Sequence, residues 1–189
     1  RELLRQLNRK PVDLLRCALL VSKHDNPEID VEQYHRSFGR LADELKDDPE
    51  IRKGAKAAVD RLSRFLFQEN GFHGSRHDFG NNSNSYINEV IDDREGLPIT
   101  LSVVFLEMAS RLGIKNVFGL ALPGHFMVGC RDPSGDGLTA IDVFDSGKEM
   151  SIEQASAMVA GDGGELPGEM LTPASEKSII LRMIRNLLN

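Results

Sequence analysis

The stretch that decides the fold runs from Asn82 to Ile114 and reads NSNSYINEVIDDREGLPITLSVVFLEMASRLGI. Its first half is polar and rich in turn-forming residues, and its second half predicts one apolar helix. Pro98 suits the first turn of that helix, where a missing N–H costs nothing, and Gly113 suits the position just after its end. Between them, apolar side chains recur at the three- and four-residue spacing of a buried helix face: Leu101, Val104, Phe105, Met108 and Leu112. We expect this to be the central helix of the domain.

Composition and charge exclude several classes of partner. The chain has 189 residues, of which 40% are hydrophobic and 28% are charged, as in a globular protein of one domain or slightly more. Nine acidic residues and one lysine between Asp132 and Glu169 give that segment a charge of −8, which leaves +2 for the rest of a chain with net charge −6. No segment is both basic and aromatic, so we expect no nucleic-acid partner. No run of about 18 apolar residues is present, so we expect no membrane partner.

The two cysteines, Cys17 and Cys130, lie far apart and do not form a disulfide framework. Leucine and alanine residues flank Cys17, which predicts that it is a small core residue. The cysteine usage favours a reducing compartment, and we expect a cytoplasmic protein.

The hydrophobic pattern predicts that residues 1–70 form a helical region that packs on the core. It predicts that residues 71–189 form the core with its C-terminal helices. Three helices are expected in the first region, at Pro11–Ser22, from an N-cap at Asp30 to about Asp47, and from about Ile51 to Glu69.

A polar segment at residues 71–81 is predicted to be a surface or lid loop, because it contains three glycines. His73 and His77 in this loop are separated by the four residues that suit a pair of metal ligands on a helix. The glycines argue against a helix, and no cysteine or third histidine follows nearby. We therefore predict no metal site here and no cofactor.

After the central helix the hydrophobic pattern changes from a period of 3.6 residues to a period of 2, which predicts an antiparallel meander. Three strands are expected, at residues 116–121, 125–130 and 138–144, with a hairpin turn over 131–137. Two helices follow, from a cap at Ser151 to Ala160 and from Thr172 onward, separated by a loop rich in glycine and proline at 161–168. A central helix followed by an antiparallel sheet predicts an α+β fold.

Two strand residues could form a catalytic pair. His125 opens the second strand and Asp142 lies late in the third, so a hairpin would bring them opposite each other, and on one face if the register is even. We predict a hydrogen bond between them. A carboxylate so placed orients an imidazole and stabilises its charged form, although such a contact also occurs as a purely structural pair. Cys130 cannot supply a thiol, because five residues of strand place it about 16 Å from His125 and on the other face.

Six short segments occur in a fixed order along the chain: GFHG at 71–74, NSYINEV at 84–90, GLPITLS at 96–102, RLGI at 111–114, PGHF at 123–126 and LRMIRNL at 181–187. Together they resemble the SirB-type branch of the transglutaminase-like superfamily. The resemblance extends from about residue 7 to the end of the chain. It implies a papain-like α+β fold.

The resemblance also implies where a catalytic triad would lie. Active members of the superfamily carry a cysteine at the start of the central helix, and a histidine and an aspartate on neighbouring strands. His125 and Asp142 match the last two. The cysteine position falls at or beside Pro98, which has no nucleophilic atom, and the SirB-type branch generally has Gly-Ile/Leu-Pro at this point. The resemblance thus implies a degenerate triad, and no established activity comes with the branch.

The first of three possible functions is a non-catalytic or regulatory domain that uses the cleft, or the helical face, to bind another protein. Asn84, Tyr86 and Asn88 in the polar segment before the central helix are expected to brace the cleft rather than act on a substrate, and Pro98 is expected to be a cleft residue. The sequence leaves the oligomeric state open.

The second possible function is a hydrolase or acyl-transfer enzyme, in which a hydroxyl of Thr100 or Ser102 replaces the thiol and His125 acts as the base. The third is a small-ligand or metal-binding module that uses His73, His77 or the acidic segment.

Overall fold

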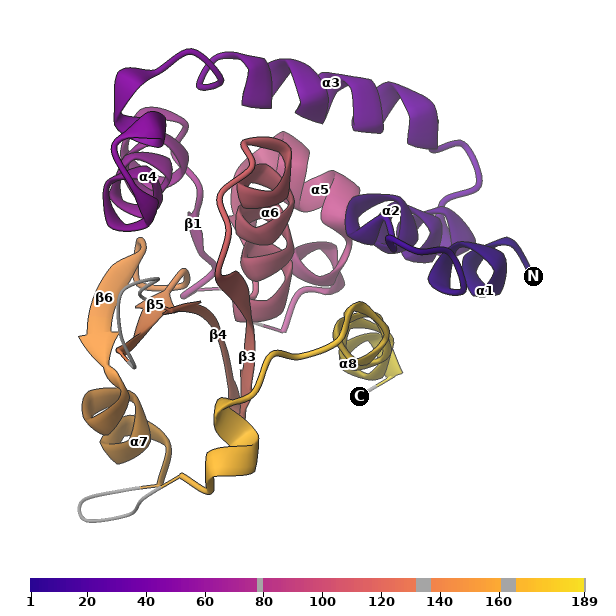
Figure 1. Ribbon diagram of the computed structural model, residues 1–189. Helices are drawn as coiled ribbons and strands as arrows, with labels where there is room; N and C mark the ends of the chain where they lie inside the picture. Colours follow the sequence, from indigo (N-terminus) through magenta and orange to yellow (C-terminus); the bar gives the residue numbers. More distant parts are fainter. Residues whose placement is uncertain (78–79, 132–136, 161–165, 189) are drawn as a thin grey trace.

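The central helix is α6, which spans Pro98–Arg111. It begins at the predicted proline, and Gly113 follows it with a left-handed φ of 69°. Helices α2, α4, α5 and α8 and the strands β3 and β4 all contact it, and Figure 1 shows it in the middle of the molecule. Most of its side chains are buried: Ile99, Thr100, Leu101, Ser102, Val103, Val104, Phe105, Met108 and Ala109. The predicted central position is therefore confirmed.

The computed structural model describes residues 1–77, 80–131, 137–160 and 166–188. No helix among these residues is long and apolar enough to cross a membrane.

The N-terminal helices are α1 (Glu2–Leu7), α2 (Leu14–Asp25), α3 (Val31–Asp43) and α4 (Ala55–Ser63). Asp30 caps α3 as predicted, because its Oδ1 accepts from the Gln33 N–H at 3.0 Å. The helix expected from Ile51 is interrupted: a 3₁₀ turn (Pro49–Arg52) is followed by Gly54 at a φ of 134°, a conformation that an L residue rarely adopts. A π-helical turn, Arg64–Glu69, continues α4.

Four antiparallel strands form the main sheet in the order β3–β4–β5–β6. They are β3 (Val117–Leu122), β4 (His125–Arg131), β5 (Leu138–Asp142) and β6 (Lys148–Ser151). A tight turn at residues 123–124 joins the first two strands, so that Leu122 pairs with His125. The fourth strand was not predicted, because it is short, polar and largely exposed. Most of the hairpin turn predicted at 131–137 lies outside the described residues.

A second, two-stranded sheet pairs β1 (His73–Gly74) with β2 (Glu95–Gly96) in parallel. Between these strands lie a 3₁₀ turn (Asn82–Ser85) and the helix α5 (Ile87–Asp93). Two residues per strand give no periodicity, so the sequence did not predict this sheet.

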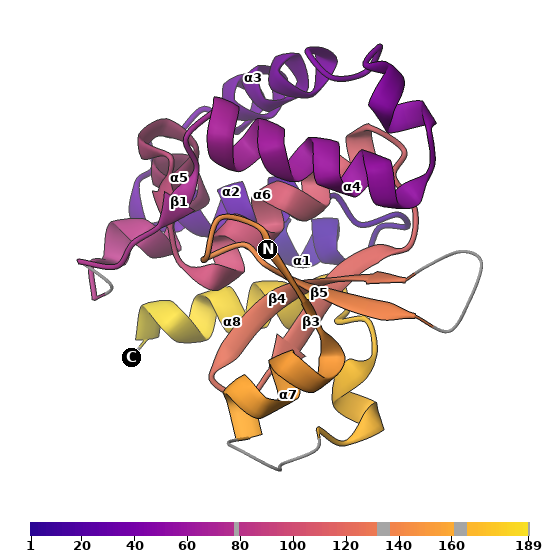
Figure 2. The ribbon, with the colours of Figure 1, turned by 90° about the vertical axis from the view of Figure 1, so that its left-hand side faces the viewer.

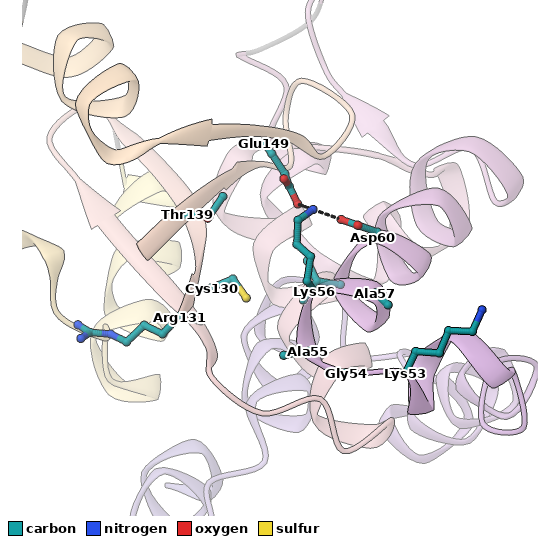
Figure 3. A pocket seen from close by; sticks show the side chains of 11 residues that line it. Lys53, Gly54, Ala55, Lys56, Ala57, Asp60, Cys130, Arg131, Thr139 and Glu149 are labelled. Atoms are coloured by element: carbon teal, nitrogen blue, oxygen red, sulfur yellow. Dashed lines mark hydrogen bonds and ion pairs between the residues drawn. The ribbon is translucent and has the colours of Figure 1, made fainter. Parts of the chain in front are cut away.

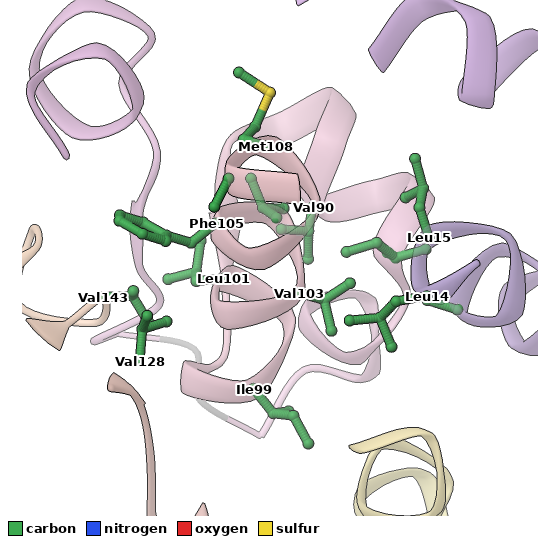
Figure 4. Packing of buried hydrophobic residues seen from close by; sticks show 14 of the residues in the cluster. Leu14, Leu15, Val90, Ile99, Leu101, Val103, Phe105, Met108, Val128 and Val143 are labelled. Carbon is green, nitrogen blue, oxygen red and sulfur yellow. The ribbon is translucent and has the colours of Figure 1, made fainter. Parts of the chain in front are cut away.

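The two faces of the main sheet pack against different elements. One face packs against α6 in a large core, which includes the side chains drawn in Figure 4 and the strand residues Phe126, Val128, Cys130, Ile141 and Val143. The opposite face packs against α7 (Ile152–Ala160) in a smaller core, made of Leu120, Leu122, Met127, Ala140 and Ala155. Figure 2 shows α7 beside the sheet, on the other side from α6.

The last helices begin close to the predicted positions. Ser151 and Gln154 form the predicted capping box at the start of α7, because each side chain accepts from the other's backbone N–H, at 2.9 and 3.3 Å. A 3₁₀ turn (Gly168–Leu171) and α8 (Glu176–Leu188) complete the chain, while most of the predicted loop at 161–168 lies outside the described residues.

Candidate functional site

A cleft of about 510 Å³ lies at the N-terminal end of α6. The start of this helix, the segment before it, the beginning of β4 and one side of α8 form its walls. The lining residues are Gly80, Asn81, Asn82, Ser85, Leu97, Pro98, Ile99, Gly124, Phe126, Arg182 and Asn186. This is the place where the resemblance implied a catalytic centre.

The start of α6 presents no nucleophile to this cleft. Pro98 lines it, and Thr100 is fully buried. The Thr100 hydroxyl accepts from the Leu97 N–H at 3.0 Å and donates to the Asn84 carbonyl at 2.9 Å. Both bonds hold the entrance of the helix to the polar segment before it. The Thr100 hydroxyl is therefore fully engaged in hydrogen bonds with backbone groups.

Ser102, the second candidate nucleophile, is also fully buried. Its hydroxyl donates to the Pro98 carbonyl at 2.8 Å, one turn back along the same helix. Among the described residues, neither Ser102 nor Thr100 forms a hydrogen bond with the His125 ring.

The strand register places His125 on the face of the sheet away from α6. His125 pairs with Leu122, and opposite residues of an antiparallel pair share a face. Leu122 belongs to the small core under α7, whereas Phe126, the next residue after His125, belongs to the core around α6. Cys130 also faces the α6 side, so its predicted separation from His125 holds.

The predicted hydrogen bond between His125 and Asp142 is not present among the described residues. Val128 pairs with Ile141, so the register points Asp142 toward the position opposite Met127, two residues beyond His125. The Asp142 carboxylate instead accepts from the backbone N–H groups of Phe144 and Asp145, at 3.0 and 3.1 Å. It therefore caps the turn after β5.

Arg182 on α8 is a cleft residue that the sequence analysis missed. Its guanidinium donates to the Leu122 carbonyl at 3.2 Å and to the His125 carbonyl at 2.9 Å, and it lies 5.4 Å from the centre of the Phe126 ring. Burial lowers the pKa of Arg182. The sequence did contain a signal for this residue. Arg182 lies beside the apolar stripe of α8, next to Ile179 and Met183, and a charged side chain at such a position indicates a specific structural or functional role.

The four residues expected at one cleft lie in different places. Pro98 lines the cleft, and Asn84 ties the segment behind it, because its Nδ2 donates to the Ser75 hydroxyl at 2.9 Å. Tyr86 lies beside a hollow between α1, α2 and α8, and burial together with Asp25 raises its pKa.

Asn88 lines a third hollow, between α3 and α5, with the acidic residues Glu28, Asp30, Glu89 and Asp92. Its Nδ2 donates to the Glu89 carboxylate at 2.7 Å, and its buried Oδ1 has no hydrogen-bond partner among the described residues. Of the four predicted residues, the structure thus brings only Asn84 and Pro98 to the start of α6.

A larger hollow of about 640 Å³ lies between α4 and the edge of the sheet (Figure 3). The Lys56 ammonium lies at 2.5 Å from Asp60 and 2.6 Å from Glu149, so its charge is already neutralised. Lys53 and Arg131 point away from the labelled side chains at its centre in Figure 3. Among the described residues that line this hollow, none consequently directs a free charged group into it.

The loop histidines do not form a cluster of potential metal ligands. His73 belongs to β1, and its Nδ1 lies 3.0 Å from the Gly71 carbonyl oxygen, while His77 is exposed. Among the described residues, the group that could hold an ion is Asp13, His35 and Glu107.

The Arg111 guanidinium occupies that group. Its Nε donates to Glu107 at 2.7 Å, and its Nη2 lies 3.0 Å from the His35 Nε2, which also lies 3.0 Å from the Asp13 carboxylate. These contacts join the start of α2, α3 and the C-terminal end of α6. We therefore interpret the cluster as a structural ion-pair network.

A central helix packed against an antiparallel sheet, with a cleft at the start of the helix, defines the papain-like class of α+β folds. The chain belongs to the transglutaminase-like superfamily, since the superfamily profile matches residues 32–185. The matched segment begins within α3 and therefore crosses residue 70, where the sequence suggested a division. The predicted fold class and superfamily are thereby confirmed.

Two bacterial relatives carry the description UPF0162 protein. The protein of Xylella fastidiosa strain 9a5c is 33% identical over 180 residues, which are 92% of this chain and 63% of the relative. The Vibrio cholerae protein is 28% identical over 155 residues, 82% of this chain and 56% of the relative. The chain thus spans about three fifths of the length of these relatives.

A human relative, F-box only protein 21, is 27% identical over 137 residues, which are 69% of this chain and 21% of that protein. No solved structure matches the chain significantly.

Proposed function

We propose that this transglutaminase-like domain is a non-catalytic module that binds another protein in the cleft at the start of α6. The observation that carries the proposal is the position of the triad residues. Pro98 lines the cleft at or beside the position where the resemblance places the nucleophile, and the strand register directs His125 to the opposite face of the sheet. An acyl transfer needs a nucleophile and a base within hydrogen-bond reach of each other.

The alternative of a serine or threonine hydrolase has less support. The Thr100 and Ser102 hydroxyls are fully buried and engaged with backbone groups. An attacking hydroxyl must reach a substrate carbonyl, and these would first have to break their bonds and leave the helix interior.

The lining of the cleft supports a peptide ligand. Leu97, Ile99 and Phe126 provide apolar walls, and Asn82 and Asn186 add amide groups at the cleft. Extended peptides are recognised by such a combination of apolar contacts and hydrogen-bonding groups. The two buried free cysteines support a reducing, cytoplasmic location.

A blocking substitution tests the proposal. Asn82 is an exposed cleft residue, so Asn82→Trp should fill the cleft without disturbing the core. Gln68→Trp, at an exposed position on the π-helical turn, is the matched control. We expect cross-linking in the native cell, followed by mass spectrometry, to identify a protein that Gln68→Trp retains and Asn82→Trp loses.

Retention of the same cross-linked partners by Asn82→Trp would contradict the proposed cleft. Labelling of Ser102 or Thr100 by a fluorophosphonate probe would contradict the non-catalytic assignment and favour the hydrolase.

A further inference from the structure

The cleft at the start of α6 has a marked charge asymmetry. Arg182 is the one charged side chain among the described residues that line it, and none of these lining residues is an aspartate or glutamate. The chain as a whole carries a net charge of −6, so a cleft with a single positive charge stands out from its surroundings.

The Arg182 guanidinium has unused hydrogen-bonding capacity. Three hydrogen bonds join it to the carbonyl oxygens of Leu122 and His125. A guanidinium has five N–H donors, so two donors have no partner among the described residues. Carbonyl groups orient the guanidinium but do not neutralise it, and the Phe126 ring covers one of its faces.

Burial of this charge has a measurable consequence. Desolvation lowers the pKa of Arg182, and no carboxylate among the described residues offsets the effect. A guanidinium held partly out of water without a counter-charge gains more from an incoming anion than an exposed one does.

The helix α6 adds to the positive potential. Its first residues, Pro98 and Ile99, line the cleft, and a helix N-terminus carries a partial positive charge of about half a proton charge. Arg182 and the helix start therefore meet in the same hollow, from two elements far apart in the sequence.

We propose that the cleft binds a carboxylate of the partner protein, which forms an ion pair with the Arg182 guanidinium in front of the N-terminus of α6. This inference rests on the proposed protein-binding function and names the chemistry of the partner. The volume of about 510 Å³ exceeds what one carboxylate fills, so the acid is an aspartate or glutamate side chain within a segment whose neighbouring apolar side chains contact Leu97 and Ile99. A phosphate group, with its higher charge, usually recruits several cationic side chains, and this cleft offers one.

The test uses pools of short, end-blocked, fluorescein-labelled peptides with mixed apolar flanks. One pool has glutamate fixed at the centre, and the matched pools have glutamine, lysine or phosphoserine there. A further pool ends in a free C-terminal carboxylate. Fluorescence anisotropy with the native protein should show that the glutamate pool binds best and that salt weakens its binding.

The matched variants are Arg182→Gln and Arg185→Gln, because both residues lie on α8 and Arg185 is exposed and outside the cleft. We expect Arg182→Gln to weaken binding of the glutamate pool by about tenfold or more. Arg182→Lys should weaken this binding less, and Arg185→Gln should leave it unchanged. A titration of the native protein that follows the Arg182 Nε–H resonance gives the same information without a substitution, should Arg182→Gln fail to fold.

Equal binding of the glutamate and glutamine pools, or equal effects of the two glutamine variants, would overturn the proposal. So would preferred binding of the phosphoserine or free-carboxylate pool, each of which would identify a different anion. If Asn82→Trp abolishes partner capture while the glutamate pool fails to bind, the cleft binds a protein by other chemistry, and the protein-binding function stands without this inference.

Discussion

The two ends of the central helix carry two arginines in opposite circumstances. At the C-terminal end, Arg111 donates to the Glu107 carboxylate at 2.7 Å and lies 5.5 Å from the centre of the Phe38 ring. At the N-terminal end, Arg182 also lies against a phenylalanine ring, but it donates to carbonyl groups alone. The charge at one end of α6 is thus paired within the chain, whereas no residue that the structure describes neutralises the charge at the other end.

The difference suggests how to separate structural charges from functional ones in this fold. A charge that the chain pairs internally contributes to stability, and its removal leaves a partner unpaired. A charge without an internal counter-charge costs desolvation energy, which a ligand can offset. The following predictions are ordered from the largest expected effect to the smallest.

Removal of Arg111 should destabilise the fold more than removal of Arg182. Arg111→Met leaves Glu107, whose side chain is 11% exposed, without its counter-charge, and we expect a loss of about 2–3 kcal/mol of unfolding free energy. Arg182→Met leaves no described carboxylate without a partner, and we expect it to lower the free energy of unfolding by about 1 kcal/mol. Urea unfolding of both variants measures this, and the reverse order would invalidate the comparison.

Thr100→Val should destabilise the entrance of α6. The substitution preserves the shape of the side chain but removes the hydroxyl that joins the Leu97 N–H to the Asn84 carbonyl. We expect a loss of about 1–2 kcal/mol, because both groups are buried. Thr100→Ser retains the hydroxyl and serves as the control in thermal unfolding. A valine variant as stable as the native protein would show that other contacts hold this entrance.

Stability should fall at alkaline pH through Cys17 on α2. Burial, assisted by the nearby Asp13 charge, raises the pKa of this thiol from 9.0 to about 11. Between these values the unfolded chain releases the thiol proton and the folded chain keeps it. The thiol's contribution to the free energy of unfolding is therefore complete below pH 9 and is lost as the pH rises toward 11. In this range the free energy of unfolding can fall by up to about 1.4 kcal/mol per pH unit.

Unfolding measurements across this pH range should therefore give a flatter profile for Cys17→Ala than for the native protein. Cys130→Ala provides a control at the other cysteine. An unchanged profile in Cys17→Ala would mean that this thiol is not buried.

Pro98→Cys should yield a reactive thiol without catalysis. A helix N-terminus lowers the pKa of a cysteine thiol, so alkylation of this residue should be faster than that of Cys17 or Cys130. The His125 ring faces the other side of the sheet, so we expect no amide hydrolysis and no acyl transfer. Activity in Pro98→Cys that a second substitution, His125→Ala, abolishes would contradict the positions assigned here.

The sequence predicts the regular elements well because their signals are local. Pro98 and Gly113 bound the central helix, Asp30 caps α3 as expected, and the period of 2 marks three of the four strands of the main sheet. The two-residue strands and the polar β6 lack such a signal. They form because tertiary contacts bring their backbones together.

The site is less predictable because it depends on register and on distant elements. Alternation along the strands gave His125 and Asp142 a common face only if the register was even, and the structure has such a register. It could not give their offset along the hairpin, nor which face the central helix covers. Arg182 enters the cleft from a helix that begins 45 residues after the end of β4, and a local pattern cannot reveal that.

The hydrogen bonds around Ser75 bring two distant points of the chain together beside the cleft. The Ser75 N–H donates to the Gly96 carbonyl at 3.0 Å, and the Asn84 Nδ2 donates to the Ser75 hydroxyl, so Ser75 and Asn84 lie at neighbouring points of the fold. Gly80, Asn81 and Asn82, which line the cleft, lie between these two points in the sequence. Lengthening such a loop twofold costs only about 0.6 kcal/mol of closure entropy. An insertion between Ser75 and Asn84 should therefore cost little stability and leave the central helix and its core unchanged.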